Sequence, residues 1–166
     1  MMGALIFAIS AVFTFGNKAE APVTPALEQR ADGWYSAAAT TLPLVRLATV
    51  IDGDTVDVLA AQTPLRIRAF GIDAPELDQR CAAAATARLG ELAANGMRLQ
   101  PDDRLQDEFG RELRYLFTVD GLSIDSAMVS EGLARAWRDD GVLRDHLVAL
   151  EDEARDARRG CLWTSG

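Results

Sequence analysis

The sequence predicts an α+β fold built on a small β-barrel, closed or partly open, that carries helices. Three observations support this prediction. Short runs rich in strand-forming residues come first in the folded part of the chain. Later segments have helical spacing and are followed by glycine. The expected order is three strands, a helix, two strands and two helices, with no internal repeat.

Three strands are expected at the start of the folded part. They cover residues 44–51, 55–60 and 65–72. The first two flank Asp52-Gly53, and Asp-Gly between apolar runs predicts a tight turn in which glycine accepts a positive φ. The third, "LRIRAFGI", changes side-chain character with a period of two, as a strand does. Two further strands are expected at 97–101 and 113–119, the second followed by an Asp-Gly turn.

Three helices are expected between and after these strands. An alanine-rich segment at 81–95 ends before Gly96, and a second segment at 123–131 ends before Gly132. Glycine is the usual residue just past a helix end. The longest helix is expected at 143–159, because its apolar residues recur every three or four positions, and Gly160 should end it.

The N-terminal part divides into two regions before the domain at 43–163. Residues 1–17 are almost wholly apolar and are typical of a signal peptide or a short membrane anchor. Residues 18–42 have no sustained period and are expected to be a linker, with a helical turn at 26–30. We therefore expect an exported protein, secreted or periplasmic, or one associated with a membrane through residues 1–17.

Length, charge and cysteine content limit the protein class further. The chain has 166 residues, which suits one domain, and a formal net charge of −8. That charge argues against a protein that coats nucleic acid through bulk positive charge. Cys81 and Cys161 do not form a C-x-x-C pair, so a structural zinc site is not expected. They form either one disulfide, which export would favour, or two buried thiols.

Two carboxylates stand where the strand pattern does not need them. Asp54 follows the first tight turn, and Asp73 ends the third strand just before Ala74-Pro75. Alone, Asp73 would most simply cap a turn. If the second and third strands pair, however, both carboxylates converge at one end of the barrel. Two hard oxygen ligands with open positions suit Ca²⁺ or Mg²⁺.

Charged residues close to these carboxylates define a reaction class. Arg68 and Arg111 can each bind phosphate oxygens with both arms of a guanidinium. Glu76, three residues after Asp73, could align or deprotonate a water molecule. Carboxylates, a metal, arginines and a phosphate together indicate metal-assisted hydrolysis of a phosphodiester.

Four short patterns in this order resemble the staphylococcal nuclease (thermonuclease) family. They are "IDGDT", an arginine five residues before "DAPE", an aromatic-Gly-Arg and a terminal "LW", and the resemblance covers residues 44–163. It implies a five-stranded OB-type barrel with three helices. It also implies an enzyme, expected to be a monomer, that cleaves DNA and RNA with Ca²⁺ and leaves 3′-phosphorylated ends.

The resemblance also implies a role for each residue of the site. Asp54 and Asp73 would bind Ca²⁺ through their side chains, and Ala74, where threonine is common, would bind it through its backbone carbonyl. Glu76 would act as general base or orient the water. The scissile phosphate would be bound and neutralised by Arg68 and Arg111.

Some residues depart from the family pattern. Phe109 stands where tyrosine is frequent, and Trp137 stands where tyrosines often stack on a base. Three aspartates make the rim beside Trp137 acidic: Asp139, Asp140 and Asp145. His146 is expected on a helix surface and Trp163 in packing. The alternative function is a non-catalytic OB-fold module that binds nucleic acid or a protein partner.

Overall fold

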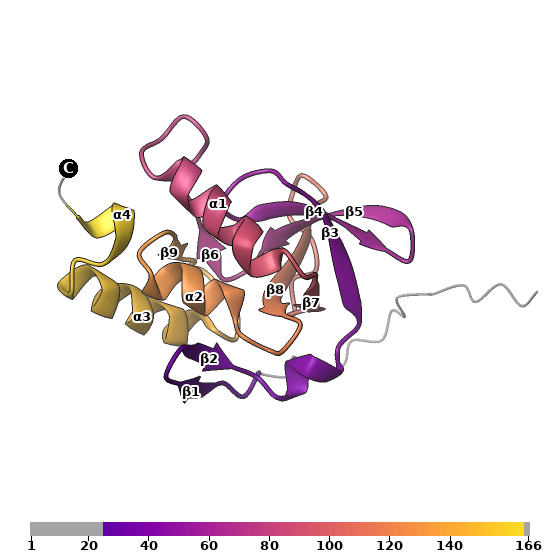
Figure 1. The fold of residues 1–166 in the computed structure, drawn as a ribbon, viewed down its shortest axis with the longest axis horizontal. Coiled ribbons are helices and arrows are strands. Elements are labelled where there is room, and N and C mark those ends of the chain that lie inside the picture. The colour runs from indigo at the N-terminus through magenta and orange to yellow at the C-terminus, as the bar shows by residue number, and fades with distance from the viewer. Residues whose placement is uncertain (1–24, 165–166) are drawn as a thin grey trace, which may run out of the picture.

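A computed structural model describes residues 25–164 of the protein (Figure 1). Five strands close into a barrel in the order β3-β4-β5-β8-β7. Their bounds are β3 Leu44–Val50, β4 Thr55–Ala60, β5 Thr63–Ala69, β7 Met97–Gln100 and β8 Glu112–Thr118. The contact between β5 and β8 is parallel and the other contacts are antiparallel. The predicted fold class is confirmed.

Helices cover one side of the barrel. Their bounds are α1 Ala82–Ala93, α2 Ile124–Ser130, α3 Arg144–Asp156 and the short α4 Gly160–Trp163. Figure 1 shows α2 and α3 side by side, with α1 lying across the barrel. Fully buried residues of the barrel, such as Ile67 and Phe117, belong to the same core as Met128 of α2 and Leu147 of α3. One core therefore joins the barrel to its helices.

The third predicted strand is shorter than expected at its C-terminal end. Strand β5 ends at Ala69, and Ile72–Asp73 forms a separate strand, β6, that pairs with β9, Arg135–Ala136. The break lies at Gly71, whose N–H donates to Asp125 Oδ1 over 3.2 Å. A Cβ at Gly71 would lie 2.4 Å from Leu147 Cδ1. Packing against α3 therefore turns the chain out of the barrel just before Asp73.

The last predicted helix, at 143–159, is three residues shorter at its C-terminal end, and a separate short helix follows it. Helix α3 ends at Asp156, and Gly160 begins α4 instead of ending α3. Gly160 has a φ of 66°, and a Cβ there would lie 1.9 Å from the carbonyl oxygen of Glu131. The glycine is needed because the chain turns tightly against the end of α2. The predicted glycine stop after α1 is confirmed, since Gly96 has a φ of 92°.

The predicted helical turn at 26–30 is wrong. Glu28–Arg30 is a strand, β1, paired with β2, Gly33–Tyr35, and a 3₁₀ turn, η1, follows at Ala38–Thr41. The described part of the expected linker, residues 25–42, is also attached to the domain by hydrogen bonds. The N–H of Ser36 donates to Gly121 O at 2.8 Å, and the N–H of Ser123 donates to Trp34 O at 2.7 Å. The hairpin is thereby held against the start of α2.

The predicted apolar segment at 1–17 lies outside the described residues. Among residues 25–164, no helix has both the length and the apolar character that crossing a membrane requires.

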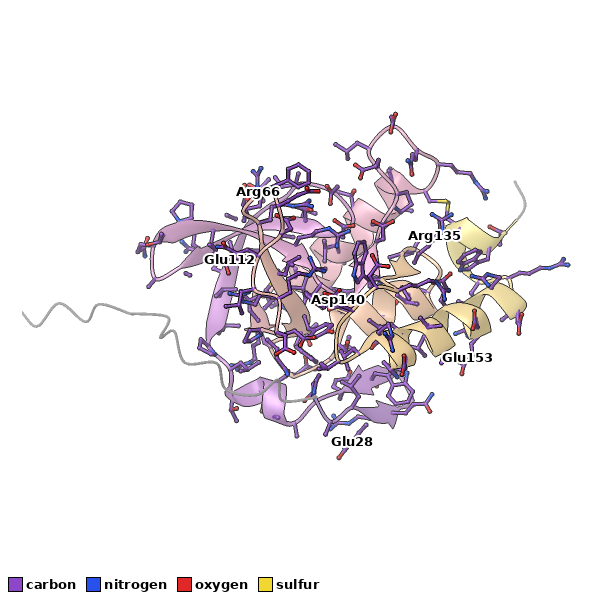
Figure 2. The ribbon with its side chains drawn as sticks, turned by 180° about the vertical axis from the view of Figure 1, so that it is seen from behind. Glu28, Arg66, Glu112, Arg135, Asp140 and Glu153 are labelled. Carbon is purple, nitrogen blue, oxygen red and sulfur yellow. A yellow bond between two sulfur atoms is a disulfide. The ribbon has the colours of Figure 1, made fainter. Side chains whose placement is uncertain are left out.

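The two cysteines form a disulfide. Cys81 and Cys161 are bonded, with their Cα atoms 5.6 Å apart and a separation of 80 positions in sequence. The bond joins the start of α1 to α4, and Figure 2 draws it as the yellow bond close to α4. Of the two alternatives that the sequence left open, the structure therefore has the bridge.

A buried carboxylate links the chain break before β6 to the barrel. Asp125 in α2 is fully buried and accepts hydrogen bonds from Gly71 N and, at 2.7 Å, from Leu116 N. Burial raises the pKa of Asp125 to about 6, although both N–H groups favour its ionised form. Unfolding returns the carboxyl to its usual pKa of about 4.

This shift predicts a defined pH dependence of stability. Between about pH 4 and pH 6 the folded state binds more protons at Asp125 than the unfolded state, so this contribution falls as pH rises. We expect the difference in unfolding free energy, wild type minus Asp125→Asn, to fall by about 2–3 kcal/mol from about pH 4 to pH 7. Urea denaturation across this range measures it. A pH-independent difference would contradict the assignment.

Candidate active site

The turn between β3 and β4 places Asp54 at one end of the barrel. Asp52 Oδ1 accepts a hydrogen bond from Asp54 N at 3.0 Å, and Ile51 N donates to Thr55 O at 2.9 Å. Gly53 lacks the positive φ that the sequence predicted. Instead, a Cβ there would lie 2.7 Å from the Cβ atoms of Ala74 and Ala85. Glycine is required because the turn packs tightly against α1 and the segment after β6.

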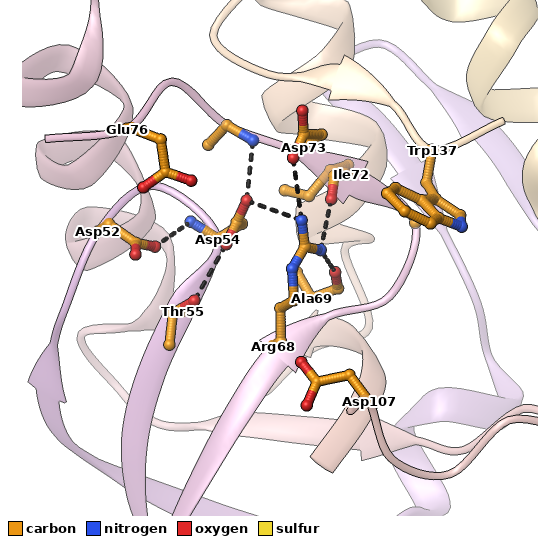
Figure 3. A network of polar contacts seen from close by, with 12 residues as sticks. Asp52, Asp54, Thr55, Arg68, Ala69, Ile72, Asp73, Glu76, Asp107 and Trp137 are labelled. Carbon is orange, nitrogen blue, oxygen red and sulfur yellow. Dashed lines mark hydrogen bonds and ion pairs between the residues drawn. The ribbon is translucent and has the colours of Figure 1, made fainter. Parts of the chain in front are cut away.

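The carboxylate of Asp54 is buried and fully engaged. Asp54 as a whole residue is only 7% exposed. Oδ1 accepts from Thr55 Oγ1 at 3.0 Å, and Oδ2 accepts from Ala74 N at 2.8 Å (Figure 3). Burial raises the pKa of Asp54, while the Arg68 guanidinium and the Ala74 N–H oppose that rise. The carboxylate is thus fixed in orientation by both neighbouring segments.

One guanidinium joins the two predicted metal ligands. Arg68 lies on β5, and its Nη2 is 3.3 Å from Asp54 Oδ2 and 3.1 Å from Asp73 Oδ1. Its Nη1 donates to the carbonyl oxygens of Ala69 and Ile72, both at 2.7 Å. Figure 3 shows Arg68 rising between Asp54 and Asp73. The predicted pairing of the second and third strands and the convergence of the two carboxylates are therefore both present.

The second predicted arginine approaches the same turn from the loop before β8. Arg111 follows Gly110, which has a φ of 77°. Arg111 Nε donates to Asp107 Oδ2 at 2.6 Å, and its Nη1 lies 3.4 Å from Thr55 Oγ1. Burial tends to raise the pKa of Asp107, but the hydrogen bonds from Arg111 bring it below its usual range. Asp107 therefore stays ionised and holds Arg111 in place.

Glu76 lies on the exposed loop that follows β6. Figure 3 shows its carboxylate on the same side of Asp54 as Asp52. Ala74 contributes its N–H to Asp54, while the role of its carbonyl as a metal ligand stays a prediction. The charged side chains of the predicted site line one cleft of about 480 Å³: Asp54, Arg68, Asp73, Glu76 and Arg111.

One arginine of this cleft was missed by the sequence analysis. Arg104 lines the cleft together with Phe70 and Trp137. The Arg104 guanidinium carbon lies 5.0 Å from the centre of the Phe70 ring and 5.9 Å from that of the Trp137 ring. Arg104 binds Asp140 through Nε and Nη2 at 2.8 and 2.9 Å. Asp140 is 36 residues away in sequence, so no local pattern could reveal the pair.

The structure refines two expectations for the segment after α2. The predicted acidic rim is partly neutralised at Asp140, because Arg104 and Trp137 Nε1, at 2.8 Å, both donate to it and the Arg104 bond lowers its pKa. His146 lies on a helix, α3, as expected, but it is only partly exposed. Its Nε2 lies 3.1 Å from Ser126 Oγ, and its ring packs edge-on against Trp34. Burial lowers the pKa of His146, in keeping with a structural role.

The carboxylates fit a hard divalent cation when water and a carbonyl complete its shell. Within residues 25–164, no three His, Cys, Asp or Glu side chains are grouped closely enough to bind a metal by themselves. Asp54 and Asp73, however, both face the point occupied by Arg68 Nη2, where a positive group already lies between them. Calcium accepts such mixed oxygen shells of carboxylate, carbonyl and water.

Comparisons with known proteins agree with this geometry. Residues 66–165 match the family described as "Staphylococcal nuclease homologue". An "Uncharacterized endonuclease" of Escherichia coli O157:H7 is 34% identical over 120 residues, which cover 72% of this chain and 76% of the relative. A "Micrococcal nuclease" of Shigella flexneri is 34% identical over 124 residues, covering 69% and 70%. "Endonuclease YncB" of Bacillus subtilis is 35% identical over 117 residues, covering 65% and 54%.

The family match includes four of the five charged side chains of the predicted site, and the fifth, Asp54, lies 12 positions before the match begins. The five-stranded barrel and its helices are the arrangement that the sequence resemblance implied. On the match over residues 66–165 and the similarity to these relatives, the chain belongs to the staphylococcal nuclease family.

Proposed function

We propose that the protein is a Ca²⁺-dependent endonuclease that hydrolyses DNA, RNA or both and leaves 3′-phosphorylated products. Membership of the nuclease family and the names of the relatives support a hydrolytic nuclease with a nucleic-acid substrate. The finer assignment rests chiefly on one observation: two carboxylates and a guanidinium meet at one point, in a cleft that also holds Arg111 and Glu76.

Charge supports a metal requirement. Among the described residues that line the cleft, acidic side chains outnumber arginines. The arginines are Arg68, Arg104 and Arg111, and the acidic residues are Asp52, Asp54, Asp73, Glu76, Asp107 and Glu108. A phosphodiester brings a further negative charge. Bound by Asp54, Asp73 and the Ala74 carbonyl, Ca²⁺ would offset this charge and polarise the phosphate. Substrate binding should therefore depend on the cation.

The side chains of the cleft would divide the remaining work. Arg68 and Arg111 would hold the oxygens of the scissile phosphate and stabilise the charge that develops on them. Glu76 would accept a proton from the attacking water or orient it. The new bond joins the water oxygen to phosphorus, the bond from phosphorus to the 5′ oxygen breaks, and a 5′-hydroxyl and a 3′-phosphate remain.

The disulfide supports the proposal of export. Structural disulfides form and persist in oxidising compartments, and Cys81 and Cys161 are bonded. We propose a secreted or periplasmic protein, or one held at a membrane through residues 1–17. We propose that it acts as a monomer.

Calcium dependence and substitution of Asp54 together test this function. The full chain should cut a labelled DNA duplex in Ca²⁺ and not in excess EDTA. Asp54→Asn should weaken Ca²⁺ binding, measured by calorimetric titration, by at least about tenfold, because site charge sets affinity. Asp57→Asn is the matched control, since Asp57 lies three residues further along, on β4, but pairs with Arg66 outside the cleft.

The opposite outcomes have distinct meanings. Cutting that persists in EDTA would overturn the metal assignment. Binding of the duplex in Ca²⁺ without any cleavage would favour the non-catalytic binding module instead.

A further inference from the structure

The loop that carries Glu76 has little to fix it along its length. Residues 76–80 are all exposed, whereas Ala74 and Pro75 just before them are buried. Inside the loop, Gln79 N donates to Glu76 O at 2.8 Å, and Glu76 N donates to Gln79 Oε1 at 3.3 Å. These bonds shape the loop without attaching it to the barrel. The position of Glu76 must therefore be set at the two ends of the loop.

The far end of the loop is tied to the C-terminal segment twice. Cys81, directly after the loop, is bonded to Cys161 in α4, and Arg80 Nη2 donates to Thr164 O at 2.6 Å. Cys81 also has a φ of 78°. A residue other than glycine keeps such a left-handed conformation where its surroundings enforce it. The bridge provides a covalent constraint at this residue.

Helix α4 is itself anchored to the domain, so the two ties are not attached to a loose end. Gly160 packs against the end of α2, and Leu162 N donates to Gly132 O at 3.1 Å. The ring centre of Trp163 lies 4.8 Å from the guanidinium carbon of Arg155 and 5.9 Å from that of Arg135. Trp163 has the packing role that the sequence predicted, and Figure 2 shows Arg135 beside α4.

The near end of the loop is held independently of the bridge. Asp73 pairs with Arg135 in the sheet of β6 and β9, and Ala74 N is bonded to Asp54. The two predicted metal ligands therefore keep their strand contacts whether or not the cysteines are joined. The far end is held by the bridge and, in addition, by α1, since Ala82 N donates to Gln79 O at 3.3 Å and Ala85 N donates to Cys81 O at 3.0 Å. The bridge is its covalent link to the C-terminal segment.

We propose that the Cys81–Cys161 disulfide positions Glu76 for the reaction, so that reducing the bridge lowers kcat while Asp54 and Asp73 stay in place. The proposal rests on the proposed nuclease function. In the redox step, a dithiol reductant such as dithiothreitol supplies two electrons and two protons. The S–S bond breaks, two thiols form, and the reductant closes to its own disulfide.

The bridge is placed where a reductant can reach it. Cys81 and Cys161 are both half-buried, in contrast to the fully enclosed core. A reducing compartment would keep the enzyme at low activity, and an oxidising one would complete it. The bridge would thus couple nuclease activity to export.

Hydrogen exchange tests the positioning directly and needs no cleavage. Three samples of the full-length protein are compared: the oxidised wild type, the reduced wild type and the double variant Cys81→Ser/Cys161→Ser. Circular dichroism and thermal unfolding first confirm that each sample is folded. We expect faster amide exchange at 76–81 in the reduced protein and in the variant, with barrel strands unchanged. Equal exchange of the loop in both redox states would overturn the proposal. If the variant does not fold, the comparison of oxidised, reduced and reoxidised wild type gives the test by itself.

Kinetics tests the consequence for Glu76. Reduction should lower kcat by about 10–100-fold, the scale of a small misplacement of a reacting group, and leave Ca²⁺ affinity unchanged. Reoxidation should restore kcat. In Glu76→Gln, reduction should have no further effect, because the bridge acts through that side chain. A loss that is equally large in Glu76→Gln, or a kcat insensitive to reduction, would contradict positioning.

The two proposals fail in different ways. If the oxidised protein does not cleave any substrate, the nuclease function fails, and hydrogen exchange still decides whether the bridge holds the loop. If it cleaves normally in both redox states, only the positioning role fails.

Discussion

Replacing Glu76 by glutamine is expected to lower kcat for DNA cleavage by about 10²–10⁴-fold, the usual contribution of a positioned general base. Glutamine keeps the shape and a hydrogen-bonding oxygen but cannot take a proton from water. Because Asp54 and Asp73 are untouched, Ca²⁺ affinity should be retained, and nucleotide affinity should change little. Single-turnover kinetics and calcium titration measure the two quantities separately.

Asp78→Asn is the matched control for this substitution. It removes one carboxylate from the same exposed loop, outside the set of residues that line the cleft. Its kcat should stay near that of the wild type. A similar kcat in Glu76→Gln and Asp78→Asn would show that no carboxylate at position 76 takes part in the chemistry.

Replacing Arg68 or Arg111 by lysine is expected to lower the cleavage rate by about 10²–10³-fold, the cost of removing one preorganised donor to a transition state. Lysine keeps the positive charge but lacks the two-armed guanidinium group. Arg68 uses both of its terminal nitrogens, one toward Asp54 and Asp73 and the other toward two backbone carbonyls. A single ammonium group cannot make both sets of contacts.

Arg66→Lys gives the control on the same strand. Arg66 lies two residues from Arg68 but pairs with Asp57 on the outer face, and its side chain is 53% exposed. Its substitution should leave the rate nearly unchanged, since exposed ion pairs contribute little. Near-normal turnover in both Arg68→Lys and Arg111→Lys would rule out the phosphate-binding role.

The barrel strands were predictable because burial on one face leaves a period of two in the sequence. Residues 55–60 form a strand with the predicted bounds. The strands β1 and β6 could not be found this way. In β1 all three residues are exposed, and β6 has two residues, too few for any period. Both exist because tertiary contacts hold them.

The charged residues of the cleft were predictable where they stand against the local strand pattern. Asp54 and Asp73 interrupt or end strands, so the sequence marks them without any knowledge of the fold. Arg104 carries no such mark, since its ring contacts with Phe70 and Trp137 and its pair with Asp140 arise only when distant segments meet. Gly53 was identified as a turn residue for the wrong reason, because the neighbours that exclude a Cβ belong to other elements.

The most direct test of the central claim is the chemistry of the cut ends. A DNA oligonucleotide is digested with Ca²⁺ in heavy-oxygen water, and the products are analysed by mass spectrometry. If water activated in this cleft attacks phosphorus and expels the 5′ oxygen, one heavy oxygen appears in a 3′-phosphate, and the other fragment carries a 5′-hydroxyl. Products with 5′-phosphate and 3′-hydroxyl ends, or no cleavage of either this DNA or an RNA oligonucleotide, would contradict the account.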